Sequence, residues 1–181
     1  MDRVYARQRH VYDLSRKYYL LGRDRLIAEL DLPPRATVLE IGCGTGRNLV
    51  RIARAYPRAT CHGVDISRQM LATADAAITR AGLGRRIVLA EGDAATFDPI
   101  ALFDVPAFDR IVISYALSMI PPWREVLRHA ASLLAPEGEL HIVDFGDQAG
   151  LPPVFRRGLE AWLARFHVAP RAGLAEEVAA V

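Results

Sequence analysis

The chain has 181 residues, 51% hydrophobic and 24% charged, which fits one globular domain and argues against long disordered segments. Its formal net charge of +2 hides a basic start, because residues 1–25 hold seven Arg and Lys residues against three Asp. Charges begin at the second residue, and the longest apolar run, near 111–122, is interrupted by serines and too short to cross a bilayer. We therefore expect a cytoplasmic protein. The basic arm suits a solvated surface, an anionic phospholipid surface or nucleic acid.

Apolar residues recur at helical spacing from Val11 to Leu30, until Pro33 and Pro34 end the pattern. This periodicity predicts one long or two short helices as an N-terminal extension over residues 1–34.

After the prolines, strands and helices alternate. The pattern predicts strands over 36–42, 59–66, 86–93, 108–117 and 139–146, and helices over 46–57, 67–83, 121–136 and 153–166. Ser67 is the expected N-cap of the second of these helices. Such alternation is typical of a parallel sheet with helices on both faces, which is a Rossmann-like α/β fold. No linker or repeat divides the chain, so we expect a single domain, 1–181, with a core over 35–146 and a helical segment over 147–181.

A glycine-rich loop, "EIGCGTGRN", joins the first predicted strand to the next helix. Glycine suits such a turn because a side chain would block the approach of a ligand to the backbone. The spacing is G-x-G-x-G, and Arg47 stands where a dinucleotide fingerprint needs Gly or Ala, which disfavours an NAD-type oxidoreductase. Glu40, two residues before the first Gly, would repel a pyrophosphate and attract a cationic ligand. The loop therefore favours S-adenosylmethionine.

Two acidic residues close the next predicted strands. Asp65 can accept hydrogen bonds from ribose hydroxyls, or it can be an acidic residue at a helix start beside Ser67. Asp93, followed by Ala94, is placed for the adenine ring, or it can simply form a turn.

Taken together with "FDRIVISYALSMI" and "GELHIVDF", these stretches resemble the motif series of class I S-adenosylmethionine-dependent methyltransferases. The resemblance covers roughly residues 36–146 and implies a sheet of order 3-2-1-4-5. It also implies a cofactor site formed by Glu40, Gly42, Cys43, Gly44, Gly46, Asn48, Asp65, Ile66, Met70, Asp93, Ala94, Ser114 and Tyr115.

The acceptor is expected at the carboxyl ends of the fourth and fifth strands, where open α/β sheets bind ligands. There Tyr115, Trp123 and Asp144 would face the methyl group. We take Tyr115, Asp144 and Tyr19 as candidate catalytic residues. "IPPW" lacks the Asn or Asp and the Tyr of the D/N-P-P-Y motif, so nucleic acid is not the expected acceptor.

The stretch "YDLSRKYYLLGRDRLI", together with "LSMIPPW", "HIVDFG" and "FHVAPR", resembles the bacterial betaine-lipid methyltransferases, which trimethylate the amine of diacylglyceryl-homoserine. The resemblance implies an amine-bearing lipid as substrate and peripheral contact with an anionic membrane. Tyrosine faces would stabilise the growing cation, and Lys17 or Arg23 would pair with the lipid's carboxylate. The substrate site would comprise Tyr12, Lys17, Tyr18, Tyr19, Arg23 and Trp123. The tyrosines could equally serve only to pack the helix onto the sheet.

Other functions remain open at this point. The acceptor could be phosphatidylethanolamine, another small amine or a quinone ring, and a non-catalytic module could use the fold to bind anionic lipid or RNA. Cys43 and Cys61 lack CxxC spacing and clustered histidines, so no metal is expected, and His129 and His141 are interpreted as helix-surface and strand residues.

Methyltransferases of this class commonly end with a strand hairpin beside the fifth strand, and residues 166–181 show at most one more helix. An unpaired fifth strand would favour a homo-oligomer formed through that edge, or low stability and activity.

Overall fold

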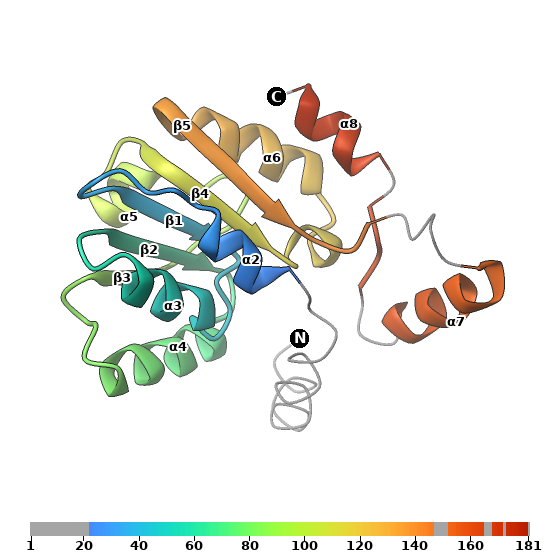
Figure 1. The fold of residues 1–181 in the computed structure, drawn as a ribbon, viewed down its shortest axis with the longest axis horizontal. Helices are drawn as coiled ribbons and strands as arrows, with labels where there is room; N and C mark the ends of the chain where they lie inside the picture. The colour runs from blue at the N-terminus through green and yellow to red at the C-terminus, as the bar shows by residue number, and fades with distance from the viewer. Residues whose placement is uncertain (1–21, 147–151, 165–167, 172, 181) are drawn as a thin grey trace.

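The sheet has five parallel strands in the order β3-β2-β1-β4-β5, as the sequence predicted (Figure 1). The computed structural model describes residues 22–146, 152–164, 168–171 and 173–180. The elements are α2 (Arg23–Ala28), β1 (Thr37–Ile41), α3 (Arg47–Ala55), β2 (Thr60–Asp65), α4 (Arg68–Arg80), β3 (Ile87–Glu91), α5 (Pro99–Phe103), β4 (Phe108–Ser114), a 3₁₀ turn η1 (Leu117–Met119), α6 (Trp123–Ser132), β5 (Leu134–Val143), α7 (Pro153–Ala164) and α8 (Leu174–Ala179).

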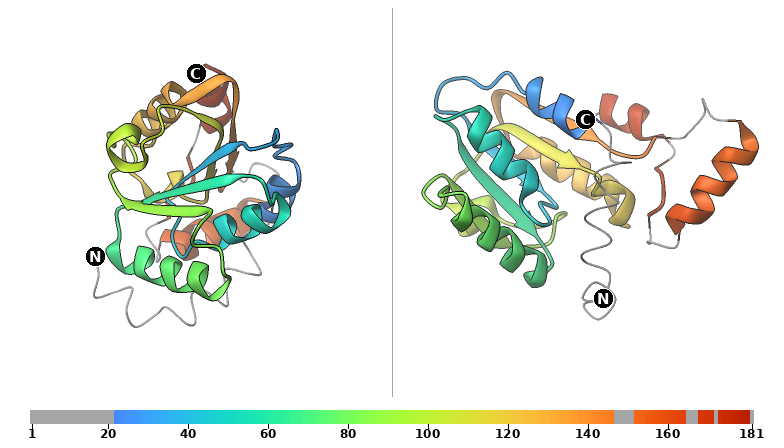
Figure 2. Two further views of the ribbon diagram at one scale, coloured as in Figure 1. Left: turned by 90° about the vertical axis from the view of Figure 1, so that its left-hand side faces the viewer. Right: turned by 60° about the horizontal axis from the view of Figure 1, so that its bottom comes forward.

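Successive side chains of the central strands pack into two hydrophobic cores, one on each face of the sheet. In β1, Val38 packs with residues of α2, α3 and α4, whereas Leu39 and Ile41 pack with residues of α6 on the other face. Figure 2 shows these helices on the two sides of the sheet. Because both faces of the central strands are covered, these strands contain runs of apolar residues, such as Val38–Leu39 and Ile111–Ile113, and this is why the sequence pattern revealed them.

The element boundaries follow the sequence with three differences. Ser67 caps α4 as predicted, since its hydroxyl accepts a hydrogen bond from the backbone N–H of Met70 at 3.4 Å. The predicted strand over 139–146 was wrong in its start and its end: β5 runs from Leu134 to Val143, and α6 ends at Ser132. The short α5 and η1 were not predicted.

An irregularity explains why the start of β5 was missed. Phe108 pairs with Leu134 but Arg110 pairs with Glu139, so five steps along β5 oppose two along β4. Glu137 has a left-handed backbone conformation with a φ of 63°. Its neighbours in the chain are Pro136 and Gly138. These residues have turn-like sequence preferences, and only pairing with β4 holds them in the sheet.

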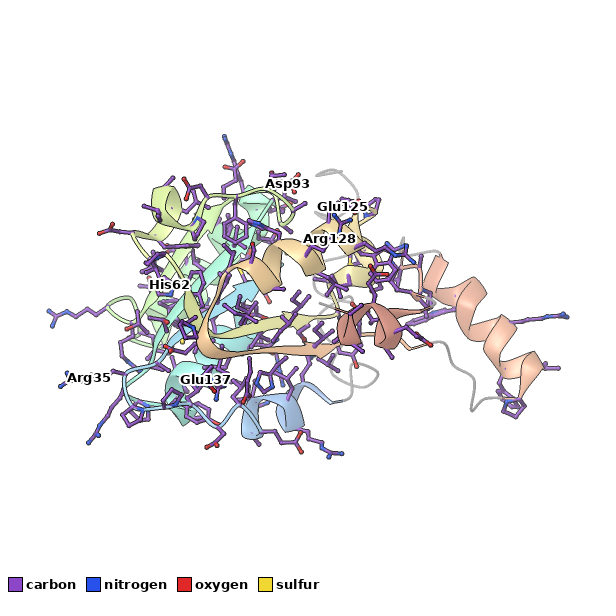
Figure 3. The ribbon with its side chains drawn as sticks, turned by 90° about the horizontal axis from the view of Figure 1, so that it is seen from above. Arg35, His62, Asp93, Glu125, Arg128 and Glu137 are labelled. Carbon is purple, nitrogen blue, oxygen red and sulfur yellow. The ribbon has the colours of Figure 1, made fainter. Side chains whose placement is uncertain are left out.

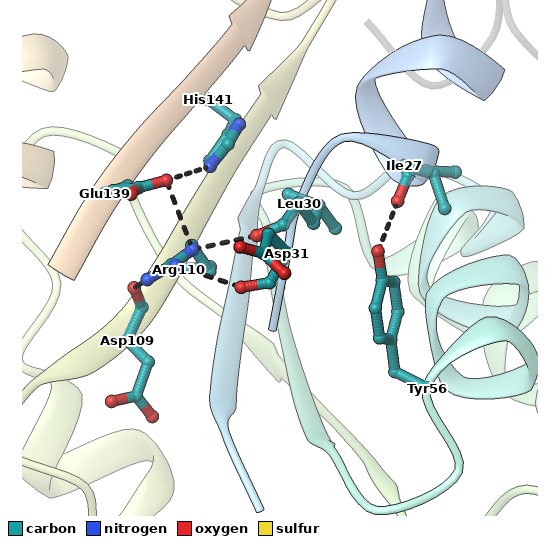
Figure 4. Close-up of polar contacts among 8 residues, drawn as sticks. All are labelled: Ile27, Leu30, Asp31, Tyr56, Asp109, Arg110, Glu139 and His141. Carbon is teal, nitrogen blue, oxygen red and sulfur yellow. Dashed lines mark hydrogen bonds and ion pairs between the residues drawn. The ribbon is translucent and has the colours of Figure 1, made fainter. Parts of the chain in front are cut away.

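The segment after α2 is fixed to the sheet by a buried arginine. Arg110 on β4 donates from Nε to the carbonyl of Leu30 at 2.9 Å and from Nη2 to the carbonyl of Asp31 at 3.1 Å (Figure 4). Tyr56, after α3, donates its hydroxyl to the carbonyl of Ile27 at 3.1 Å. These contacts hold α2 against the core, although it has only six residues.

Within the described ranges, β5 pairs with β4 alone and forms one edge of the sheet. Association of two chains through this edge stays a prediction. None of the helices in the described part combines the length and apolar character needed to cross a bilayer.

Candidate cofactor and acceptor site

The glycine-rich loop turns sharply at the carboxyl end of β1. Gly42, Gly44 and Gly46 have φ values of 69°, 54° and 71°, which lie in the left-handed region that favours glycine. A Cβ atom on Gly42 would lie 2.7 Å from the Cβ of Ala116, whereas one on Gly44 would meet nothing within 4 Å. The first glycine is therefore required by the fold itself, and the second leaves the backbone open to a ligand.

Glu40 is buried beside this loop, with only 2% of its surface exposed. Its Oε1 accepts a hydrogen bond from Nδ2 of Asn48 at 2.8 Å, while its buried Oε2 has no hydrogen-bond partner among the described residues. Burial raises the pKa of Glu40 to about 8, although the Asn48 hydrogen bond and the positive charge of Arg23 act to lower it. A buried carboxylate oxygen without a donor is costly, so this atom is suited to receive a cationic donor from a ligand.

Asp65 joins the end of β2 to the glycine loop. Its Oδ2 accepts a hydrogen bond from the N–H of Gly44 at 2.8 Å, and its Oδ1 accepts one from the N–H of Ser67 at 2.9 Å. The contact with Ser67 confirms the interpretation of Asp65 as an acidic residue at a helix start. Each carboxylate oxygen can accept a second hydrogen bond, so the side chain still fits two ribose hydroxyls.

The residues assigned to adenine lie at the ends of β2 and β3. Asp93 accepts a hydrogen bond from the N–H of Ala95 at 2.8 Å, so it does form a turn. Ile66 is 71% exposed, which leaves its side chain open to contact with a flat ring. Figure 3 shows Asp93 apart from Arg35, which precedes β1, and from Glu137, which lies early in β5.

On the acceptor side, Tyr115 directly follows β4 in a strained conformation. Its φ is 54°, which is uncommon for a residue other than glycine, and its N–H donates to the carbonyl of Val143 at 2.7 Å. The ring packs edge-on against Phe145, with centroids 4.9 Å apart. Burial raises the pKa of the Tyr115 hydroxyl, and the positive charge of Arg23 opposes this shift.

Asp144 follows β5 and is held by two backbone donors. Its Oδ1 accepts from the N–H of Phe145 at 2.7 Å and its Oδ2 from the N–H of Ser118 at 3.1 Å. Burial raises the pKa of Asp144 above the ordinary value, and the hydrogen bonds act in the opposite direction. The structure thus brings Asp144 and Tyr115 to neighbouring strand ends, as the sequence predicted.

Three residues that were not predicted from the sequence support this side of the site: Ser118, Phe145 and Arg171. Arg171 donates to the carbonyls of Leu117 and Ile120, both at 2.9 Å. The N–H of Ala169 donates to the carbonyl of Ser118 at 2.9 Å. The segment 168–171 therefore fixes the η1 turn that carries the donor to Asp144. No sequence signal links Arg171 to this turn, because the contact spans more than fifty residues.

Three other predicted residues take distinct places. Arg23 lies in α2, where its charge acts on both Glu40 and Tyr115, and the neighbouring Asp24 ties α2 to Arg47 at 2.9 Å. Ser114 ends β4 with a buried hydroxyl that has no hydrogen-bond partner among the described residues. Trp123 is buried in the core at the start of α6, with Arg124 over its ring at 4.2 Å.

Several residues of the predicted site are not tested by the geometry. Tyr12, Lys17, Tyr18 and Tyr19 lie outside the described residues.

Cys43 is buried beside the loop, and Cys61 is buried in β2, where burial raises its pKa to about 12. His129 and His141 lie on α6 and β5 as interpreted. Across the residues that can be described, no cluster of side chains has the make-up of a metal site.

Comparisons with known proteins agree with this arrangement. The methyltransferase domain family matches residues 39–140. A demethylmenaquinone methyltransferase of Corynebacterium efficiens is 31% identical over 85% of this chain and 62% of its own length. The ubiquinone/menaquinone biosynthesis C-methyltransferase UbiE of Syntrophotalea carbinolica is 30% identical over 95% of this chain and 69% of its own. The chain thus spans about two thirds of the length of these curated relatives.

Among solved structures, the YcgJ protein of Bacillus subtilis has a TM-score of 0.70 at 23% identity, over 87% of this chain and 64% of its own. This likeness shows the fold. The family match covers more than half of the chain and includes the last three residues of β1, the glycine loop and the ends of β2, β3 and β4. The chain therefore belongs to the S-adenosylmethionine-dependent methyltransferases, as the resemblance of its motifs predicted.

Proposed function

We propose that the protein transfers a methyl group from S-adenosylmethionine to a lipid acceptor at the carboxyl ends of β4 and β5. The observation that carries methyl transfer is the buried Oε2 of Glu40, which has no hydrogen-bond partner among the described residues and belongs to the strand end from which the glycine loop begins. A cationic amino-acid group fits that oxygen, and Asp65 fits the ribose of the same ligand. Dinucleotides would instead place a negative pyrophosphate near Glu40, which the buried carboxyl disfavours.

The cofactor's sulfonium would supply the methyl group, and this chain would bind and align the reactants. Glu40, Asn48, Gly44, Asp65 and Ile66 are the residues suited to hold it. Since methyl transfer is an in-line displacement, positioning and the exclusion of water contribute most of what a protein can add. The left-handed backbone at Tyr115 and the fixed η1 turn suit this demand for rigid placement.

For the acceptor, a quinol-type aromatic ring is the favoured candidate. The relatives that match 85% or more of the chain are named for demethylmenaquinone or for ubiquinone and menaquinone methylation. As the methyl leaves the sulfonium and bonds to a ring carbon, that carbon must lose its hydrogen as a proton, and removal of a hydroxyl proton first makes the ring a better nucleophile. Asp144 is a partly buried carboxyl with a raised pKa next to the Tyr115 and Phe145 rings, placed to accept a proton. A base with a pKa nearer neutrality removes such a proton more readily than an ordinary aspartate.

The amine of diacylglyceryl-homoserine is the second candidate. It rests on the resemblance of the N-terminal and C-terminal stretches to the betaine-lipid methyltransferases, and one contact favours it. The edge-on pair of Tyr115 and Phe145 beside Asp144 offers two aromatic rings and one carboxylate, which together suit a nitrogen that becomes a permanent cation.

Labelled S-adenosylmethionine separates these candidates. The full chain would be incubated with demethylmenaquinol, diacylglyceryl-homoserine or phosphatidylethanolamine in detergent micelles, and the products would be resolved by chromatography and mass spectrometry. We expect label in the quinol product. Label only in diacylglyceryl-homoserine would favour the second candidate, and label in none of the lipids with intact cofactor binding would contradict both.

A further inference from the structure

The outer side of α3 and α4 carries a groove of about 480 Å³ lined by arginines. Its lining residues are Thr45, Arg47, Val50, Arg51, Arg54, Thr73, Ala77, Arg80 and Ala81. Four of them are arginines and none is acidic. Figures 1 and 2 show α3 and α4 side by side on the same face of the sheet. The groove is separate from Glu40, Asp65 and Asp93, which are not among its lining residues.

Helical spacing produces this concentration of charge. Arg47, Arg51 and Arg54 are four and three residues apart, so they form one stripe along α3. On α4, Thr73, Ala77 and Arg80 repeat the same spacing and face the groove. Like charges at these separations destabilise a helix, and α3 contains no acidic residue that would offset them. A negative charge from outside α3 would offset the repulsion between these arginines.

Asp24 supplies negative charge at one end of the groove. Its Oδ1 pairs with Nη2 of Arg47 at 2.9 Å and with Nη1 of Arg51 at 2.5 Å. The side chains of Arg54 and Arg80, at the other end, form no ion pair or hydrogen bond with any residue in the described part of the chain. Two guanidinium groups thus remain available in a concave site.

We propose that this groove binds the phosphate of an anionic phospholipid headgroup and thereby holds the domain on the membrane. Guanidinium forks match phosphate oxygens in pairs, and the hydroxyl of Thr73 adds a further donor. Val50, Ala77 and Ala81 provide aliphatic surface for the glycerol and the first methylene groups of a lipid. The groove has no aromatic side chain on which a base could stack, which disfavours single-stranded RNA.

The inference deepens the proposed function, because a lipid acceptor must be reached from a membrane surface. The groove extends to Thr45 and Arg47, next to the glycine loop, so the anchored face adjoins the cofactor side of the sheet. The surface differs from the basic N-terminal arm, which the sequence alone suggested for the same purpose.

The test measures vesicle binding without cofactor or acceptor, so its outcome does not depend on methyl transfer. The full chain would be sedimented with vesicles of phosphatidylglycerol and phosphatidylcholine, or of phosphatidylcholine alone, at physiological salt. We expect binding only to the anionic vesicles. The double variant Arg54→Gln/Arg80→Gln should bind them about 30-fold more weakly, the effect of two basic residues near an anionic leaflet.

The matched control is Arg124→Gln/Arg128→Gln, which removes the same charge from α6 on the opposite face of the sheet (Figure 3). Less than a twofold loss in this control would support a specific groove. An equal loss of vesicle binding in both double variants would overturn the proposed groove, because net charge alone would then explain the binding. Tighter binding to a fluorescent RNA oligonucleotide than to the vesicles, or full displacement by millimolar inorganic phosphate, would overturn the lipid assignment.

Discussion

Asn48, in the first turn of α3, donates from Nδ2 to Oε1 of Glu40 at the end of β1, over 2.8 Å. Both side chains are buried, and the hydrogen bond fixes one carboxylate oxygen, while the other forms no hydrogen bond with the described residues. This geometry fits the proposed role of Glu40 as the acceptor for a cationic group of the cofactor.

Replacing Glu40 with Gln should weaken cofactor binding by about 10-fold to 100-fold, because one charge-assisted hydrogen bond is lost. The fold should survive, since Gln keeps an oxygen for Asn48 and removes a buried carboxyl. Calorimetry with S-adenosylmethionine measures the affinity. The control Glu139→Gln removes an exposed carboxylate from β5 and should leave the affinity unchanged. Equal weakening in both variants would contradict the assigned role of Glu40.

Cofactor binding at pH 7 should release a proton from Glu40. With a pKa of about 8, Glu40 is mostly protonated in the free protein, and a bound cation favours the ionised form. The heat of binding should therefore vary with the ionisation enthalpy of the buffer. The same variation in Glu40→Gln would mean that another group releases the proton.

The stability of the free protein should fall as the pH rises from about 4.5 to about 8. The unfolded chain loses the Glu40 proton near 4.5, whereas the folded protein keeps it until about 8, so the folded state binds more protons in this window. Denaturant titrations across the window would measure the free energy of unfolding. Glu40→Gln should flatten this dependence, and an unchanged slope would contradict it.

Alanine at two glycines of the loop should separate folding from binding. Gly42→Ala should lower the free energy of unfolding by about 2 kcal/mol or more, since a left-handed alanine is strained and its Cβ would clash with Ala116. Gly44→Ala meets no protein atom and should lower it by only about 1 kcal/mol. Its cofactor affinity should nevertheless drop, because the added methyl group faces the ligand. Normal cofactor affinity in Gly44→Ala would contradict the placement of the ligand at this backbone.

Asp144→Asn should reduce kcat by about 10²-fold to 10⁴-fold if Asp144 accepts the acceptor's proton. The wild-type rate should rise with pH through the pKa of Asp144, which burial places above its ordinary value, because only the ionised form takes a proton. Asn should abolish this rise while leaving the affinity for cofactor intact. A change in KM alone would assign Asp144 to acceptor binding.

Arg171→Gln should lower kcat while leaving cofactor affinity near normal. Its guanidinium bonds to the carbonyls of Leu117 and Ile120 hold the turn from which Ser118 donates to Asp144, so Arg171 is a positioning residue. Single-turnover rates and calorimetry would measure the two quantities. Arg124→Gln, which breaks an exposed ion pair between α6 and α8, is the control and should change neither. An equal fall in kcat in the control would mean that general loosening of the C-terminal segment is responsible.

The resemblance of the motifs to a known family implied the strand order, which the structure shows. The sequence by itself determined the strands of the sheet, the start of α4 and the turn at the glycine-rich loop. These features depend on local signals: apolar runs buried on both faces, an N-cap at Ser67, and glycines where the backbone must turn left-handed. Glu40, Asp65 and Asp93 could be placed because the carboxyl ends of parallel strands meet at one edge.

Only the tertiary structure decided the contacts that join distant segments. The early start of β5 depends on pairing with β4 across a bulge, and turn-like residues gave no local sign of it. The support of Asp144 depends on backbone groups, which leave no trace in residue type: the N–H of Ser118 donates to Asp144, and Arg171 donates to the carbonyl of Leu117. The arginine groove needed two helices to lie side by side, because each stripe alone has the pattern of an ordinary solvated helix face.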